Sequence, residues 1–106
     1  MFDLKKLQKM QRDLQERMSS MQEELAAQRV EGSAGGGMVQ VTATGTQEIL
    51  DIKIQPEAVD PNDIEMLQDL IIAAANDALE KARQLSQQSM ARIMPGGAGL
   101  PSLPFF

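Results

Sequence analysis

Apolar side chains return every three or four residues along the first quarter of the chain, and Gln11 is the one break in the series. They are Leu4, Leu7, Leu14, Met18, Met21 and Leu25. This spacing predicts a helix over about residues 3–27 with one narrow apolar stripe of the kind that pairs helices in coiled coils. At 1.5 Å per residue the helix would be roughly 38 Å long. A small chain cannot cover that length alone, so we expect a second chain to contribute.

Three short segments after this helix have the character of β-strands. In MVQVTATG every second residue from Val39 is apolar, and EILDIKI alternates in the same way from Leu50. We expect strands over about 38–44 and 48–54 with a tight turn at Gly45-Thr46, and a weaker strand over about 29–34. The glycine-rich stretch GSAGGG ends the first helix and permits a bulge or close backbone contact.

The stretch DPNDIEML predicts the start of a second helix, over about residues 61–93. Asp60 would be its N-cap, Pro61 its first residue, and Asp63 would lie near the positive end of its dipole. Pro95 ends it. Residues 1–94 then form one domain, and residues 95–106, PGGAGLPSLPFF, form a Pro/Gly-rich tail. The tail is either mobile or a short docking segment for a neighbouring subunit or partner, and the sequence leaves both open.

Charge is distributed unevenly along the chain, in the order positive, negative, positive. The net charge is +2 over residues 1–17, −10 over 18–80 and +3 over 81–106. At 100° per residue, Lys5, Lys9 and Arg12 lie within about 60° of one another, with Lys6 to one side, opposite the apolar stripe. They form either an anion-binding surface or a solvated face on which Lys9 pairs with Asp13 and Arg12 with Glu16.

Residues suited to catalysis are scarce. The chain has no His and no Cys, and no Ser lies in a nucleophile elbow. Adjacent carboxylates at Glu23-Glu24 point about 100° apart on a helix. The glycine cluster lacks the Lys-Ser/Thr of a phosphate-binding loop and precedes a strand instead of a helix. Capping accounts for Asp60 and Asp63 without a metal. We expect no catalytic residues, cofactor, metal or small-molecule substrate.

Segments that direct a chain into or across a membrane are not expected either. No apolar run follows the N-terminal charges, and no stretch approaches the roughly 20 apolar residues that span a bilayer. The absence of Cys fits a reducing compartment. We expect a soluble, cytoplasmic protein.

Three stretches resemble the YbaB/EbfC family of small bacterial nucleoid-associated proteins. They are MSSMQEEL, GGGMVQVTATGTQEILDIKIQPEAV and, above all, EMLQDLIIAAANDAL. The resemblance extends in order from about Leu4 to Met94. It implies an α+β fold with a long N-terminal helix, a three-stranded antiparallel sheet and a C-terminal helix, in which two chains interlock through their sheets as a tweezer-like homodimer.

The resemblance also implies binding of double-stranded DNA in the bacterial nucleoid, with roles in nucleoid organisation and gene regulation. The matching basic positions are Lys5, Lys6, Lys9 and Arg12, as contacts to phosphate. Because only three aromatic residues and no base-reading motif are present, we expect contacts mainly to the DNA backbone and a weak sequence preference. The alternative is a dimeric adaptor that holds protein or ribosome-associated partners through its acidic body or its tail.

Overall fold

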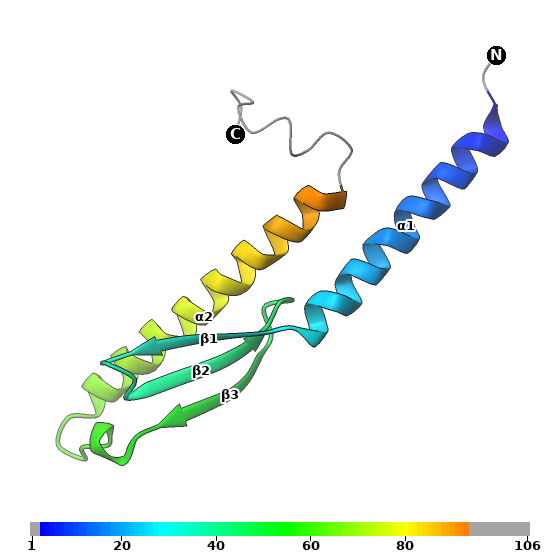
Figure 1. The fold of residues 1–106 in the computed structure, drawn as a ribbon. Coiled ribbons are helices and arrows are strands. Elements are labelled where there is room, and N and C mark those ends of the chain that lie inside the picture. The colour runs from blue at the N-terminus through cyan, green and yellow to red at the C-terminus, as the bar shows by residue number, and fades with distance from the viewer. Residues whose placement is uncertain (1–2, 94–106) are drawn as a thin grey trace, which may run out of the picture.

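The computed structural model describes residues 3–93, and its elements follow one another as α-β-β-β-α. They are helix α1 (Leu4–Ala27), strands β1 (Arg29–Ala34), β2 (Val39–Thr44) and β3 (Ile49–Ile54), a short 3-10 helix η1 (Pro56–Ala58) and helix α2 (Ile64–Ile93). This arrangement confirms the expected α+β class with a long helix at each end of a three-stranded sheet (Figure 1). The tail over 95–106 lies outside the described residues.

The sheet is antiparallel in the order β1-β2-β3, and α2 lies along one of its faces (Figure 1). The alternation in β2 directs Val39, Val41 and Ala43 toward the helix, where all three are fully buried. There they pack in one cluster with Ala74 and Ala78 of α2. The polar residues between them face the other side of the sheet, as the period of two requires.

Strand β3 is more exposed than its alternation predicts. Its register with β2 pairs Ile52 with Val41 and Ile54 with Val39, so these isoleucines face the side on which α2 lies. They nevertheless remain 42% and 39% exposed, because α2 packs over β1 and β2. A bulge opposite Thr42 and Ala43 leaves Leu50 without a partner and breaks the simple alternation. The expected half-buried strand is therefore uncovered on its apolar face in a single chain.

The β2–β3 turn differs in detail from the expected Gly45-Thr46 hairpin. The residue with positive φ is Gln47, at 66°, and the Thr44 hydroxyl accepts hydrogen bonds from the Thr46 and Glu48 amides. Gly45 instead donates its N–H to the Leu25 carbonyl at 2.9 Å. A Cβ at Gly45 would lie 2.7 Å from that oxygen. Glycine is needed here for close contact with the end of α1.

Helix α2 begins at Ile64, three residues later than expected, and Asp60 is not its N-cap. The Asp60 carboxylate accepts the Asn62 N–H at 2.9 Å, and its carbonyl accepts the Asp63 N–H, which closes a turn before the helix. The Asp63 carboxylate accepts the Met66 N–H at 3.2 Å, the bond expected of an N-cap. Either aspartate could cap a helix, but the turn that begins at Asp60 makes Asp63 the N-cap of α2.

The outer edge of β1 is closed by two side chains of α2. Asp77 accepts the Ser33 N–H at 3.1 Å, and the Lys81 ammonium donates to the Glu31 carbonyl at 2.8 Å. The Ser33 N–H is the main cause that lowers the pKa of Asp77, and Lys81 adds to it. These bonds occupy backbone groups that would otherwise invite another strand to pair.

Close contact between β1 and α2 requires Gly32. A Cβ at this position would lie 2.3 Å from both the Ala74 carbonyl oxygen and the Ala78 nitrogen. Backbone atoms cannot move aside as a flexible side chain can, so only glycine permits this approach. The contact fixes the helix over β1 and thereby determines which strand stays uncovered.

We predict that Gly32→Ala lowers the free energy of unfolding by about 2–3 kcal/mol, because the methyl group overlaps the α2 backbone. Gly36→Ala is the matched control, since Gly36 has φ +66 and no atom within 4 Å of its Cβ position. It should cost only about 1 kcal/mol, from backbone conformation alone. Urea unfolding at one protein concentration measures both, and equal losses would contradict the packing role.

Candidate nucleic-acid interface

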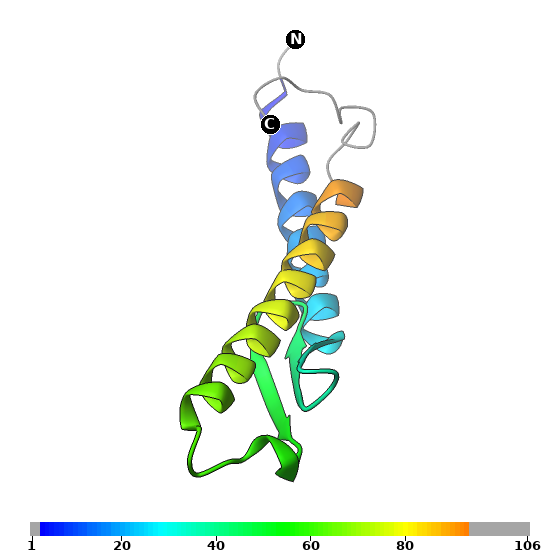
Figure 2. The same ribbon diagram turned by 90° about the vertical axis from the view of Figure 1, so that its left-hand side faces the viewer.

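Helix α1 projects away from the sheet (Figures 1 and 2). Every residue from Leu4 to Ser20 is exposed, and within the helix only Met21 and Leu25, near the sheet, are buried. A single residue, Gln28, connects the helix to β1, and its N–H bonds to the Glu24 and Leu25 carbonyls. The part of α1 from Leu4 to Ser20 therefore stands as an arm in solvent.

The four predicted site residues, Lys5, Lys6, Lys9 and Arg12, all lie on the exposed outer half of this arm. We call them the basic tip. Because they fall within three turns of one continuous helix, Lys5, Lys9 and Arg12 share one side and Lys6 lies beside them. The apolar stripe occupies the opposite side. The structure thus brings all four residues to one end of the molecule.

The start of α1 adds to the positive potential of the basic tip. The Asp3 carboxylate accepts the Lys5 N–H at 3.0 Å and caps the helix. The first turn then contains Lys5 and Lys6 and no acidic residue. Cations at this end oppose the helix dipole and cost some helix stability. The same arrangement places lysine charges where a helix already attracts anions.

No carboxylate between residues 3 and 93 forms an ion pair with the basic tip. Between residues 3 and 93, the two ion pairs within 4 Å are Lys81–Asp77 and Arg83–Glu80, both within α2. The alternative pairs considered from sequence, Lys9 with Asp13 and Arg12 with Glu16, are not formed. The four cations are thus available to an anionic partner.

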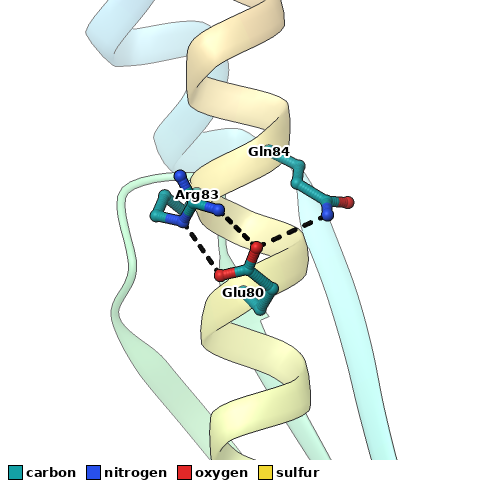
Figure 3. Close-up of polar contacts among 3 residues, drawn as sticks. All are labelled: Glu80, Arg83 and Gln84. Carbon is teal, nitrogen blue, oxygen red and sulfur yellow. Dashed lines mark hydrogen bonds and ion pairs between the residues drawn. The ribbon is translucent and has the colours of Figure 1, made fainter. Parts of the chain in front are cut away.

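Two cations of α2 are engaged by their own helix. Figure 3 shows the Arg83 guanidinium against the Glu80 carboxylate, with Nε 2.9 Å from Oε2, and the Gln84 amide beside it. The guanidinium lowers the pKa of Glu80, and the carboxylate raises the pKa of Arg83. Lys81 is held by Asp77 and the Glu31 carbonyl. Both cations are exposed, but each already has a partner.

Sequence reasoning missed one grouping of charges. An open cleft lies between α1 and the end of α2, and it brings Arg17 together with Arg92. Its lining also includes Asp13, Glu16 and Glu24, which outnumber the two arginines. The positive charge balance of the last segment pointed to Arg92, but only the packing of α2 beside α1 shows which residues it meets. This acidic lining restricts a favourable surface for polyanions to the outer arm.

Other chemistry has little support among the described residues. Within 3–93 no group of three or more His, Cys, Asp or Glu side chains could hold a metal ion. Glu23 and Glu24 are exposed on α1, and Asp60 and Asp63 bond to backbone amides. Over the same residues, neither helix is long and apolar enough to cross a membrane.

Comparison with known proteins places these features in context. A family model described as the YbaB/EbfC DNA-binding family matches residues 1–98. A protein of Syntrophobacter fumaroxidans named "Nucleoid-associated protein" is 54% identical over 90 residues, which are 85% of this chain and 81% of that protein. One of Acetivibrio thermocellus with the same name is 52% identical over 100 residues, 94% of this chain and 85% of its own.

A solved structure shares the fold. The crystal structure of uncharacterized protein HP0035 from Helicobacter pylori superposes with a TM-score of 0.80 at 21% identity. The match covers 90% of this chain and all of the other. At this level of identity the likeness concerns the fold.

We predict that Asp3→Ala unravels the first turn of α1, because the Lys5 amide loses its cap. Hydrogen exchange of the amides near Lys5 and Lys9 should become about fivefold faster, which corresponds to about 1 kcal/mol. Asp3→Asn, which keeps an acceptor oxygen, should change these rates little. Equal acceleration in both variants would indicate that charge, and not the capping bond, holds the turn.

Proposed function

This chain belongs to the YbaB/EbfC DNA-binding family, and from that premise we propose that it is a homodimeric nucleoid-associated protein that binds double-stranded DNA through the basic tip. The observation that carries the proposal is the exposure of Lys5, Lys6, Lys9 and Arg12 without carboxylate partners at the end of a projecting helix. Such a surface attracts the phosphate backbone and releases its counterions.

Contacts to phosphate dominate in this proposal, and sequence preference is weak. Lysine ammonium groups act as point charges on flexible stems and carry little geometric information about base edges. The only aromatic residues of the chain are Phe2, Phe105 and Phe106, so stacking on the bases of a single strand has few candidates. DNA binding with weak sequence preference would organise the nucleoid and thereby affect gene regulation.

The dimer follows from the uncovered half of the sheet. Ile52 and Ile54 face the side of α2 but lack its cover. Because Asp77 and Lys81 turn toward β1, the opposite flank of α2, with Ile72 at 57% exposure and Leu79, faces the β3 side. Strand β3 and this flank of α2 together form an exposed apolar surface. A second copy related by a twofold axis would fill it with the same surface.

Dimerisation would also strengthen the binding of DNA by the basic tip. A single arm offers only its four cations to phosphate, and so small a set binds DNA weakly at physiological salt. Two arms from one dimer double that number and tie the second binding event to the first. The α1 stripe and the β3 face are separate surfaces, so pairing through the sheets leaves both arms available.

We predict that changing the four residues of the basic tip to Gln removes most of the salt dependence of DNA binding. The slope of log K against log salt should fall by about 0.9 for each phosphate that the variant no longer neutralises. Fluorescence anisotropy with generic duplexes of different sequence measures this, and every duplex should weaken by about the same factor.

Two single substitutions distinguish the effect of the basic tip from the effect of the protein's net charge. Lys9→Gln and Arg83→Gln each remove one positive charge, but Arg83 is already paired with Glu80. Only Lys9→Gln should reduce the slope. Equal effects would mean that net charge and not the basic tip governs binding. Wild-type protein that shows no binding at low salt would favour the adaptor through the acidic body.

We predict that Ile52→Glu converts the dimer to a monomer of 11.6 kDa in sedimentation equilibrium, because it places a charge in the apolar interface. Gln40→Glu is the control, since it adds the same charge on the opposite face of the sheet, where Gln40 pairs with Lys53. That variant should remain dimeric. A dimer that survives Ile52→Glu would rule out the β3 face as the interface.

A further inference from the structure

Five apolar side chains of the arm remain exposed in the described chain. They are Leu4, Leu7, Met10, Leu14 and Met18, with exposed fractions from 37% to 66%. We call them the arm stripe. Leu4, Leu7, Leu14 and Met18 lie on the side of α1 opposite Lys5, Lys9 and Arg12, and Met10 lies at the edge of this row nearest Lys6. None of the five lines the cleft between α1 and the end of α2. A row of this length along a helix indicates a partner for that face.

The described chain ends beside α1, and residues 94–106 begin there. They follow Ile93, the last residue of α2, and Arg92 lines the cleft against α1. Met21 lines the same cleft and continues the stripe toward the sheet. The cleft therefore lies beside the inner end of the stripe, on a neighbouring side of α1.

Length and composition fit the same surface. Nine residues in the polyproline II conformation, 98–106, extend about 28 Å, and the arm stripe from Met18 to Leu4 extends about 21 Å. The segment contains no charged side chain, so it carries no cost of desolvating a charge against the apolar helix. None of its side chains would compete for the basic tip.

The spacing of the apolar residues gives the strongest argument. Pro101 and Pro104 favour polyproline II, which repeats every three residues, and Leu100, Leu103 and Phe106 occur at that interval. Successive side chains on this face are about 9.3 Å apart. Residues one heptad apart on α1, such as Leu7 and Leu14, are about 10.5 Å apart. The spacing of apolar residues from Leu100 to Phe106 is therefore close to the heptad spacing on α1, over both intervals of the segment.

We propose that residues 94–106 dock on the arm stripe of their own chain, with Leu100, Leu103 and Phe106 against α1. The docked segment braces the outer half of the arm and covers its apolar side. The basic tip, on the opposite side, stays open. This inference does not depend on DNA binding and goes beyond it.

Neighbouring phenylalanines supply a matched pair of variants. Phe106→Ser removes a side chain from the docking face, and Phe105→Ser removes the same side chain from another face of the polyproline II helix. In the full-length dimer, Phe106→Ser should accelerate hydrogen exchange of the amides from Leu7 to Leu14 about threefold to tenfold. Phe105→Ser should leave them nearly unchanged. Equal rates in wild type and both variants would overturn the proposal.

A second measurement identifies the chain that supplies the segment. Because the protein has no Cys, Ser102→Cys carries a single nitroxide, and the methyl signals of Leu7 and Leu14 report its proximity. We expect these signals to weaken when nitroxide and isotope label are on one chain, while Ile52 is unaffected. Weakening only in mixed dimers with the two labels on different chains would overturn docking in cis and assign the stripe to the partner subunit's segment.

Discussion

The close backbone contact between Gly32 of β1 and the Ala74–Ala78 turn of α2 determines the rest of the structure. It holds the helix over β1 and β2, with Asp77 and Lys81 closing the outer strand edge. A helix fixed there cannot also cover β3. The isoleucines of β3 are therefore left uncovered, and the dimer that we propose depends on a contact made within one chain.

Separation of charge follows from the same arrangement. The sheet and most of α2 contain the acidic part of the sequence, whereas α1 carries its lysines outward on a helix that packs only at its inner end. Acidic residues line the cleft between the arm and α2, and the cations of α2 at Lys81 and Arg83 have partners. An acidic protein can in this way present a surface that favours a polyanion, because local potential within about 10 Å outweighs net charge.

Local chemistry accounts for what the sequence could predict. Heptad spacing defined α1, alternation defined the core face of β2, and helical periodicity was enough to place the basic tip on one side of the arm. Competing local signals limited the prediction for α2, because Asp60 and Asp63 can both cap a helix. The role of Gly45, the exposure of β3 and the meeting of Arg17 with Arg92 depend on contacts between elements. No local pattern encodes these contacts.

The most direct test of the proposed interface is amine-reactive footprinting of the protein with and without a generic DNA duplex at low salt. The chain contains five lysines, three in the basic tip and two elsewhere, at Lys53 and Lys81. We expect DNA to protect Lys5, Lys6 and Lys9 and to leave Lys53 and Lys81 as reactive as before. Protection of Lys53 or Lys81 with an unprotected basic tip would contradict the proposed interface.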